Sequence, residues 1–316
     1  MKNVLITSFG SNTSIGIAKC LQNECKIIGV DINDPHLCNG YIFADIFEKI
    51  PYYTEKDDYE TVLNSLVDKH KVDLIIPVHD KEIELQAKLS EEGKIKTKVA
   101  VNSLDIIKLC NSKSKINHYL SDTVNVPYQY NSKYDVKFPV ILKDEEGVSS
   151  RDIFIAYKKE DMKMVSLDGK IIQQFISGGT EYTVDCFSSY ITTEFYYSVR
   201  KRTETKSGMS VKSEIIDNPI LGELCSKIHK KLNYVGASNI QFIIKNEIIY
   251  FIEINPRFAG GGILTYKSGY NFPLMTVNEL CNSEKSNPDE LAIGNKMVRY
   301  YEETFFDSSN NHIRLR

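Results

Sequence analysis

Hydrophobic residues in the first third of the chain switch repeatedly between short continuous runs and helical spacing. Runs typical of buried strands cover residues 3–10, 25–33, 72–80 and 98–103, and helical patterns cover 13–24, 58–71 and 81–94. In the helical segment 58–71, for example, Leu63, Leu66 and Val67 recur at helical spacing. Strands that alternate with helices are typical of a parallel sheet. We therefore predict a small α/β domain over residues 1–110.

The remaining two thirds of the chain carry a different series of patterns. The predicted elements are a capped helix at 111–123, two strands joined by a polar loop within 136–157, two strands around a turn at 177–179, a strand with a basic end at 190–204, an amphipathic helix at 221–234 and a hairpin over 238–256. A chain of 316 residues is long enough for two or three domains. We therefore expect at least one further domain after residue 110.

The hairpin places polar side chains where a core strand would carry apolar ones. Because side chains alternate between the two faces of a strand, Glu253 and Asn255 share one face and Ile252 lies on the other. A three-residue loop at 245–247 would bring Gln241 of the first strand onto the same face, whereas a two-residue loop would separate them. Such a patch of oxygen donors suits Mg²⁺. The alternative is an ordinary half-exposed face of a sheet.

Composition narrows the classes of partner and compartment. The formal net charge is −3, which gives no general electrostatic case for nucleic acid. The apolar runs are too short to span a bilayer, and the N-terminus lacks the pattern of a secretory signal. Seven cysteines without a CxxC pair indicate free thiols in a reducing cytoplasm, and metal binding through Cys or His is not expected.

The segment 236–262, "GASNIQFIIKNEIIYFIEINPRFAGGG", resembles the metal-and-phosphate hairpin of the ATP-grasp superfamily. It is most similar to the synthetase halves of carbamoyl-phosphate synthetase large subunits, whose pattern is N-x-Q on one strand and E-x-N-P-R on the next. The resemblance implies that Gln241, Glu253 and Asn255 hold two Mg²⁺ ions, or Mn²⁺, between the phosphates of ATP. It also implies that Arg257 faces the transferred phosphate or an acyl phosphate. The glycines at 260–262 would let the backbone approach the acceptor closely.

Two lysines match the family's phosphate contacts. Lys113, in "CNSKSKINHYL", begins a helix, where the macrodipole disfavours a cation unless a phosphate is bound nearby. The alternative is a solvated surface lysine. Lys143 ends the apolar strand "FPVILK", an unusual place for a lysine without a partner. The loop "DEEGVSSRD" then stands where the family has a glycine-rich phosphate loop; it contains only one glycine, and Ser150 and Arg151 are its expected donors.

The stretch "IIQQFISGGTEYTVD" resembles the family's hinge strand. The resemblance implies that Gln174, Phe175 and Ile176 receive adenine, largely through backbone N–H and C=O groups, and that Glu181 binds the ribose. A backbone edge suits the donor and acceptor of adenine, and apolar side chains suit its ring. The same stretch also fits a plain hairpin.

Two arginines share a strand face in "SVRKRTETKSGMS". Arg200 and Arg202 are two positions apart, with Lys201 opposite, and two guanidinium groups on one face could clamp a substrate carboxylate. The alternative is a charged face in solvent.

The resemblance implies an α/β ATP-grasp fold with a Rossmann-like pre-ATP-grasp domain. The expected boundaries are 1–110 for that domain, 111–172 for a small subdomain with the phosphate loop, and 173–316 for a subdomain with the metal site. The implied activity is an ATP-dependent ligase that converts a small carboxylate to an acyl phosphate, releases ADP and joins the acyl group to an amine. Its partners would be these small molecules, with neither nucleic acid nor membrane, and a homodimer is a possible assembly.

Other functions remain open from the sequence. Bicarbonate or carbamate phosphorylation, as in carbamoyl-phosphate synthetases, is one alternative, and a non-catalytic nucleotide-binding module is another. A nicotinamide-dependent oxidoreductase has some support from "TSFGSNTSIG" after the first strand and from Asp31 after the second. The glycine spacing there is not G-x-G-x-x-G, and no catalytic pair for hydride transfer is evident.

Overall fold

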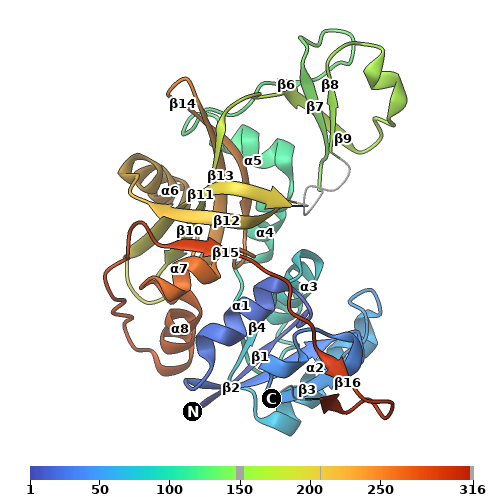
Figure 1. Cartoon of the computed structure of the whole chain (residues 1–316), viewed down its shortest axis with the longest axis vertical. Coiled ribbons are helices and arrows are strands. Elements are labelled where there is room, and N and C mark those ends of the chain that lie inside the picture. The colour runs from blue at the N-terminus through green and yellow to red at the C-terminus, as the bar shows by residue number, and fades with distance from the viewer. Residues whose placement is uncertain (147–152, 207, 314–316) are drawn as a thin grey trace.

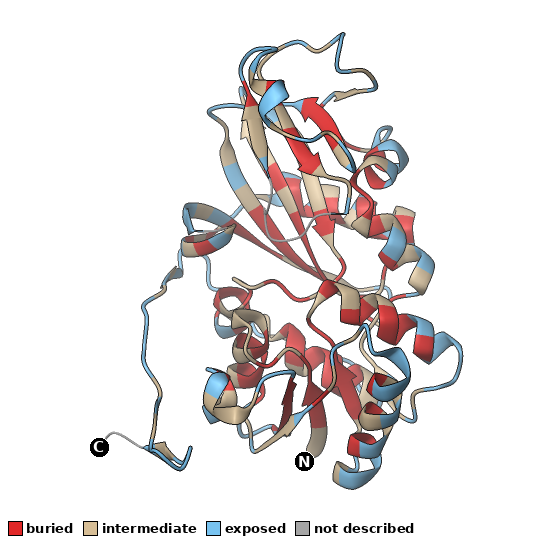
Figure 2. Ribbon diagram, turned by 90° about the vertical axis from the view of Figure 1, so that its right-hand side faces the viewer, coloured by how far each residue is buried: buried red, intermediate tan, exposed pale blue. Residues whose placement is uncertain are grey.

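The computed structural model describes residues 1–146, 153–206 and 208–313 (Figure 1). Its strands form a parallel sheet at the N-terminus, a small antiparallel sheet, a large antiparallel sheet and a two-stranded ribbon near the C-terminus. In Figure 1 the large sheet lies between the small sheet at the top and the N-terminal sheet below. Figure 2 shows that buried residues concentrate in the strands, whereas the loops around the small sheet are largely exposed.

The N-terminal sheet is parallel throughout, as the sequence pattern predicted. Its strand order is β3-β2-β1-β4-β5, the order of doubly wound α/β sheets. The strands are β1 Lys2–Ile6, β2 Cys25–Asp31, β3 Ile46–Lys49, β4 Leu74–Ile76 and β5 Lys98–Val99, and the helices are α1 Asn12–Leu21, α2 Lys56–His70 and α3 Asp80–Glu91. The strand β3 had not been predicted.

Alternating side chains of β1 pack into two different cores. Val4 and Ile6 face one core together with Ile17 of α1, and Leu5 faces the other together with Leu63 of α2. The first core also contains Phe272 of helix α8, Phe272–Val277. Residues from the C-terminal part of the chain therefore help to cover the N-terminal sheet, next to α1.

The small sheet has the order β6-β9-β7-β8 and is antiparallel. Its strands are β6 Gln129–Tyr130, β7 Val140–Asp144, β8 Phe154–Ala156 and β9 Lys170–Gln174. Val140, Leu142 and Ile172 pack into a core on one face. Because side chains alternate, Ile141 and Lys143 point to the opposite face, which is the face turned toward the candidate site.

The large sheet has the order β14-β13-β10-β11-β12-β15 and carries a helix on one face. Its strands are β10 Thr180–Ser188, β11 Phe195–Lys206, β12 Met209–Ile216, β13 Gly236–Lys245, β14 Ile248–Asn255 and β15 Lys296–Val298. The helix α6, Pro219–Leu232, buries Leu221, Ile228 and Leu232 against this sheet, as its amphipathic pattern predicted. The strand β12 had not been predicted, because lysine and serine side chains interrupt its apolar positions.

The hairpin of β13 and β14 corrects the predicted loop. The connection has two residues, Asn246 and Glu247, with φ of 49° and 64°, as in a type I′ turn. The prediction of a three-residue loop was therefore wrong. A bulge restores the pairing: Phe242 faces Phe251, but Gln241 faces Glu253, so one extra residue of β14 lies between the two pairs.

The bulge also changes which apolar residues of β14 are buried. Phe251 packs in the core with Ile254, although strict alternation along the strand would place it on the same face as Glu253. Ile252, predicted on the opposite face, lines the same cavity as Glu253. The extra residue reverses the alternation within β14.

Several further elements had no sequence prediction. The helix α4, Leu104–Asn111, is one of these; it lies just before the predicted helix, which is α5, Lys113–Leu120. Another is α7, Ile263–Lys267, which follows the hairpin. After β15 the chain runs down to the ribbon of β16, Phe305–Phe306, and β17, His312–Ile313 (Figure 1). There, Phe306 contacts the rings of Tyr41 and His36 in the N-terminal part.

None of the helices described is long and apolar enough to cross a membrane.

Candidate nucleotide and metal site

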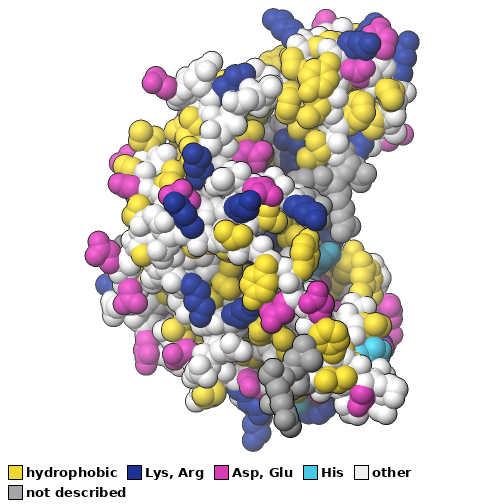
Figure 3. Space-filling model, in the orientation of Figure 1, with side chains coloured by type: hydrophobic (Ala, Val, Ile, Leu, Met, Phe, Trp, Pro, Cys, Tyr) yellow, Lys and Arg dark blue, Asp and Glu magenta, His cyan; other side chains and the backbone are white. Residues whose placement is uncertain are grey.

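A cavity of about 310 Å³ lies between the small sheet and the large sheet. Its charged and polar walls include Lys113, Lys143, Glu181, Arg202, Gln241 and Glu253, and its apolar walls include Ile141, Ile153, Phe175, Ile176, Ile243 and Ile252. Figure 3 shows a hollow between the two sheets with Lys and Arg side chains along it. A mixed lining of apolar surface and convergent charged groups is typical of a site for a small ligand.

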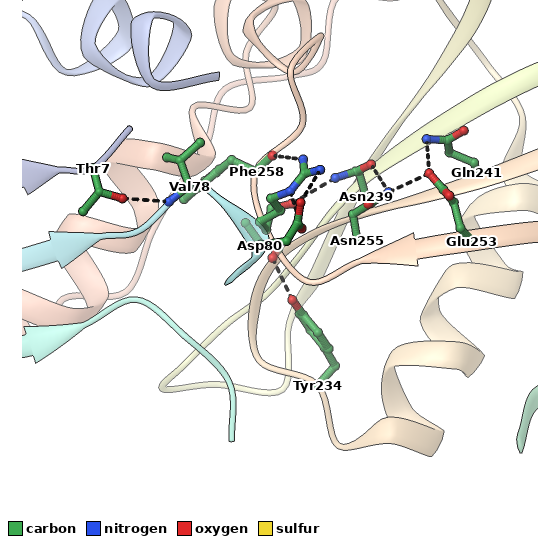
Figure 4. A network of polar contacts seen from close by, with 11 residues as sticks. Thr7, Val78, Asp80, Tyr234, Asn239, Gln241, Glu253, Asn255 and Phe258 are labelled. Carbon is green, nitrogen blue, oxygen red and sulfur yellow. Dashed lines mark hydrogen bonds and ion pairs between the residues drawn. The ribbon is translucent and has the colours of Figure 1, made fainter. Parts of the chain in front are cut away.

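Gln241, Glu253 and Asn255 converge, as the hairpin pattern predicted. Glu253 Oε1 accepts hydrogen bonds from Gln241 Nε2 at 2.7 Å and from Asn255 Nδ2 at 3.1 Å (Figure 4). Asn239 extends the group, since its Oδ1 accepts from Asn255 Nδ2 at 3.1 Å and its Nδ2 donates to the carbonyl of Arg257 at 3.0 Å. The bulge in β14 makes this convergence compatible with the two-residue turn.

Arg202 links this group to Glu181. Its Nη1 donates to Gln241 Oε1 at 3.1 Å, and an ion pair of 3.0 Å joins Nη1 to Glu181 Oε2. Nη2 donates to the carbonyl of Gly208 at 2.6 Å. Burial lowers the pKa of Arg202, and Glu181 partly offsets this. Arg202 therefore lies in the cavity wall, between the proposed metal ligands and the residue expected at the ribose.

Two buried lysines face the same carboxylate. Lys113 begins α5 and is 9 % exposed, and Lys143 on β7 is 7 % exposed. Burial lowers the pKa of Lys143 to about 8, although Glu253 opposes the shift, and burial likewise lowers the pKa of Lys113. Within the part of the chain that the structure describes, Lys143 Nζ has no hydrogen bond or ion pair. The two lysines bring positive charge to the wall of the cavity, and the carboxylates of Glu145, Asp144 and Asp80 offset part of the charge of Lys113.

The N-terminus of α5 is neutralised by a protein carboxylate. Glu145 accepts hydrogen bonds from Ser112 Oγ, from Ser114 Oγ at 2.6 Å and from Ser114 N at 3.2 Å. Burial opposes ionisation of Glu145, but these bonds outweigh it and lower its pKa. Glu145 therefore balances the macrodipole of α5 without a bound phosphate. The macrodipole is consequently no evidence for a phosphate near Lys113. Lys113 does line the cavity, as predicted.

The predicted phosphate loop is described only at its ends. Ser150 and Arg151 lie outside the described residues. At the near end, Asp144 forms an ion pair with Lys170, and Glu146 pairs with Lys81 of α3 at 3.1 Å. At the far end, Ile153 lines the cavity. Asp144 and Glu146 are therefore engaged with neighbouring lysines, and Glu145 between them is engaged with the serines at the start of α5.

The hinge residues line the cavity, but two of their N–H groups are already used. Gln174 N donates to the carbonyl of Tyr128 at 2.8 Å, and Phe175 N donates to the carbonyl of Pro139 at 3.2 Å. These two N–H groups are consequently engaged within the protein, so the predicted backbone contacts to adenine would have to come from the N–H of Ile176 and from the hinge carbonyls. Ile176, by contrast, has no backbone N–H bond to a described residue.

Arg200 is not in the cavity, which corrects the predicted pair of arginines. It is 1 % exposed, and its Nε and Nη2 donate to the carboxylate of Asp185 at 2.6 and 2.8 Å. Thr265 Oγ1 of α7 donates to the same carboxylate at 2.6 Å. Arg200 therefore forms a buried ion pair beneath α7. Of the two arginines, only Arg202 lies where it could contact a ligand in the cavity.

The glycine run packs on these buried side chains. A Cβ on Gly261 would lie 2.5 Å from Arg200 Nη1, and one on Gly262 would lie 2.3 Å from Tyr266 Oη. Arg299, which follows β15, donates from Nη2 to the carbonyl of Gly260. Close packing over Arg200 and Tyr266 thus explains why side chains are excluded at 261 and 262, where the sequence argument had placed an acceptor.

Arg257 points away from the cavity lining, toward the N-terminal sheet. Its Nε and Nη2 donate to Asp80 Oδ1 and Oδ2 at 2.8 and 3.3 Å, and its Nη1 donates to the carbonyl of Phe258 at 3.3 Å. Asp80 is the first residue of α3, and three residues separate it from the end of β4 (Figure 4). The sequence analysis did not identify Asp80, because nothing local marks it as a partner of a residue 177 positions away.

Glu253, Gln241 and Asn255 can supply only some of the ligands that Mg²⁺ needs. Among the described residues, no cluster of three His, Cys, Asp or Glu side chains could hold a metal alone. Glu253 offers one carboxylate, and the amides of Gln241 and Asn255, which here turn their nitrogens toward it, each carry one oxygen as well. Mg²⁺ commonly takes one or two carboxylates and completes its shell with phosphate oxygens and water. The residues therefore suit a metal that arrives with a nucleotide.

Comparison with known sequences identifies one domain. Residues 110–261 match the family model for the ATP-grasp domain. The chain is 25% identical over 239 residues to a carbamoyl-phosphate synthase of Methanobrevibacter smithii, covering 66% of this chain and 62% of that protein. It is 25% identical over 236 residues to a carbamoyl phosphate synthase large chain of Clostridium acetobutylicum, covering 65% and 21%. The chain thus matches less than two thirds of the length of these relatives.

Comparison with solved structures identifies the fold. A biotin carboxylase from Campylobacter jejuni superposes with a TM-score of 0.75 at 15% identity, covering 94% of this chain and 74% of that one. An N5-carboxyaminoimidazole synthetase from Staphylococcus aureus, solved with ADP, gives a TM-score of 0.74 at 16% identity, covering 93% and 81%. These results confirm the resemblance inferred from the hairpin: residues 110–261 of this chain match the ATP-grasp domain, and the fold is the ATP-grasp fold.

Proposed function

We propose that this protein is a Mg²⁺-dependent ligase that uses ATP to join a small carboxylate to an amine. A carboxylate oxygen attacks the γ-phosphorus, the bond between that phosphorus and the β–γ bridging oxygen breaks, and ADP leaves. The amine nitrogen then attacks the acyl carbon and displaces phosphate. The observation that carries the proposal is the single cavity in which Glu253, bonded to Gln241 and Asn255, faces Lys113 and Lys143.

The roles follow from where each side chain lies. Lys113 and Lys143 would contact the phosphates of ATP, where their positive charge stabilises the charge that moves during transfer. Glu181 would bind the ribose, while the apolar side chains of Phe175 and Ile176 would enclose the base.

Gln241, Glu253 and Asn255 would hold Mg²⁺, two ions in our proposal, with Mn²⁺ as a substitute. The metal would neutralise phosphate charge when bound. Hydrogen bonds between β13 and β14 and within β14 hold these three side chains close together. Ser150 and Arg151 remain proposed donors of the phosphate loop.

Arg257 has a positioning role in this proposal, in place of direct contact with the acyl phosphate. Its guanidinium binds Asp80, and its carbonyl accepts from Asn239, which in turn binds Asn255. The chain of bonds thereby connects the N-terminal sheet to the metal ligands. Arg202 is the remaining arginine that is placed in the cavity.

A second candidate is phosphorylation of bicarbonate or carbamate. It is favoured by the sequence relatives, because several are named carbamoyl-phosphate synthases. The chemistry of the first step is the same, since bicarbonate oxygen would attack the γ-phosphorus as a carboxylate does. We further propose the domain boundaries 1–110, 111–172 and 173–316, a cytoplasmic location, and a homodimer, since one structural neighbour is described as a biotin carboxylase domain dimer.

The test is ADP release with a panel of acids and amines. Purified protein would be incubated with ATP, Mg²⁺ and pairs drawn from amino acids, small carboxylates and bicarbonate, and the product of any active pair would be identified by mass spectrometry. The expected result is acid-dependent ADP formation that Glu253→Gln abolishes and Glu247→Gln, at the exposed turn of the same hairpin, leaves intact. Wild-type protein that binds no nucleotide, or equal turnover by Glu253→Gln, would overturn the proposal.

A further inference from the structure

Arg299, just after β15, is a partly buried arginine without a carboxylate partner. Its Nε donates to the carbonyl of Ser210 at 3.2 Å, and its Nη2 donates to the carbonyl of Gly260. Within the part of the chain that the structure describes, Arg299 has no ion pair, whereas each of the other three arginines there has one. A charge that is partly withdrawn from water needs a counter-charge, and here the protein supplies none.

The surroundings of Arg299 are positively charged. Burial lowers the pKa of Arg299, and the charge of Arg200 lowers it further. Arg200 lies directly beneath the glycine run, since a Cβ on Gly261 would be 2.5 Å from its Nη1. Two guanidinium groups near each other create a positive potential that attracts an anion.

The strand register places Arg299 on the same face of the large sheet as the cavity wall. Ser213 of β12 pairs with Arg202 on one side and with Met297 of β15 on the other. Arg299 lies two residues beyond Met297, and its N donates to the carbonyl of Val211 at 2.9 Å, which continues the pairing. Because side chains alternate, Arg299, Ser213 and Arg202 project from one face. Arg202 lines the cavity, so this face is continuous with the candidate site.

Two buried polar atoms on this face have no hydrogen bond among the described residues. They are Arg202 Nε and Ser213 Oγ, and Ser213 is only 3 % exposed. Arg299 Nη1 likewise has no hydrogen bond to a described residue. Since buried polar groups are nearly always bonded, unsatisfied donors beside a cation without a counter-charge indicate a place for an anionic group.

Arg299 lies far from the proposed metal ligands. Its backbone is in line with β15, four strands from β13 in the sheet, which corresponds to about 19 Å at about 4.8 Å a strand. After burial, the charges that act on the pKa of Arg202 and of Arg257 include Glu253, whereas among the described residues Arg200 alone acts on Arg299. A group bound by Arg299 is therefore not the carboxylate that meets the γ-phosphate.

We propose that Arg299 binds a carboxylate of the substrate that takes no part in the reaction. One of the two substrates would then carry a further carboxylate, as a dicarboxylic acid or an amino acid does. The planar guanidinium suits a carboxylate, and Nη1 can donate to it. The inference rests on the proposed ligase function and specifies the class of substrate that the same site accepts.

The test compares compounds that differ only in one carboxylate. Dissociation constants would be measured by calorimetry, with Mg²⁺ and ADP present, for glutarate against butyrate, glutamate against γ-aminobutyrate, and alanine against ethylamine. We expect the compound with the additional carboxylate to bind about 10- to 100-fold more tightly in at least one pair. A preference in the first pair assigns the carboxylate to the acid substrate, and one in the third pair assigns it to the amine.

Two variants show whether Arg299 is the source of the preference. Arg299→Gln should abolish it, while Arg299→Lys, which retains the charge, should restore part of it. The matched control is Lys296→Gln, at an exposed position of β15 beside Glu214, which should keep the wild-type ratio. Because the ratio compares two compounds on one variant, a general loss of stability would not change it.

The outcomes separate this inference from the proposed function. If the wild-type protein prefers the additional carboxylate in none of the pairs, or if Arg299→Gln keeps the wild-type ratio, the role of Arg299 is wrong. The ligase proposal then still stands on ADP release. If the wild-type protein binds no ATP, both are wrong.

Discussion

Arg257, just after β14, and Asp80, at the start of α3, form an ion pair with two hydrogen bonds of 2.8 and 3.3 Å. Asp80 is 6 % exposed, so the pair is largely shielded from water. Asn239 binds the carbonyl of Arg257 and the amide of Asn255, so the pair is continuous with the proposed metal ligands. The N-terminal sheet therefore supports the candidate site through this contact.

Replacement of Asp80 by Asn should destabilise the protein. The substitution leaves the Arg257 guanidinium without its counter-charge in a largely buried position, and we expect the free energy of unfolding to fall by about 2–3 kcal/mol. Urea unfolding followed by circular dichroism measures this quantity. The matched control is Asp58→Asn, in the exposed first turn of α2, which should change the free energy of unfolding by less than about 0.5 kcal/mol. Equal effects of the two substitutions would show that the ion pair is not stabilising.

Lys143 should make nucleotide binding depend on pH. Burial lowers its pKa in the folded protein to about 8 from 10.5, so the ammonium is lost as the pH rises through about 8. Phosphate binding favours the charged form, so ATP binding should take up protons above pH 8, and the affinity for ATP should fall by at most about tenfold per pH unit. Calorimetry of ATP binding in buffers of different ionisation enthalpy measures the proton uptake.

The lowered pKa of Lys143 also predicts how the stability of the protein changes with pH. The folded state holds the Lys143 proton less tightly than the unfolded state does. Burial of the charged ammonium therefore lowers the free energy of unfolding, and this loss is present in full below about pH 8. The cost is relieved as the pH rises from about 8 towards 10.5. Lys143→Arg stays charged over this range and should reduce both the proton uptake and this rise in stability, whereas Lys115→Arg, exposed on α5, should change neither. An undiminished proton uptake in Lys143→Arg would exclude Lys143 as its source.

The turn between β13 and β14 predicts a stabilising substitution. Glu247 adopts a φ of 64°, a left-handed conformation that costs a residue with a Cβ about 1–2 kcal/mol. Glu247→Gly should therefore raise the free energy of unfolding by about 0.5–1 kcal/mol, after the extra entropy of glycine in the unfolded chain is allowed for. Glu247→Gln, measured in the same unfolding experiment, separates the backbone effect from loss of charge. Should both variants match the wild type, the positive φ would not be a source of strain.

The convergence of three polar side chains on the hairpin was predicted from the sequence, but with the wrong loop length. The convergence of Gln241, Glu253 and Asn255 was predicted from a three-residue loop, but a two-residue turn and a bulge together produce the same pairing. A bulge depends on how both strands pack, and no local pattern in β14 marks it. The alternation rule consequently placed Phe251 and Ile252 on the wrong faces.

The partners of the arginines could not be predicted from local pattern. Arg200 and Arg202 share a strand face, but Asp185 on β10 and the cover of α7 bury the first, while the second reaches the cavity. Arg257 likewise finds Asp80 in a distant part of the chain. The parallel sheet, by contrast, follows from repeated local patterns of apolar residues, and it was predicted correctly.

The most direct test of the metal site is the effect of Mg²⁺ on nucleotide affinity. The dissociation constant of ATP would be measured with Mg²⁺ and with EDTA for the wild type, Glu253→Gln and Glu247→Gln. We expect Mg²⁺ to tighten ATP binding by at least about tenfold in the wild type and in Glu247→Gln, and to have little effect in Glu253→Gln. If Glu253→Gln responds to Mg²⁺ as the wild type does, Glu253 does not hold the metal and the account of this site is contradicted.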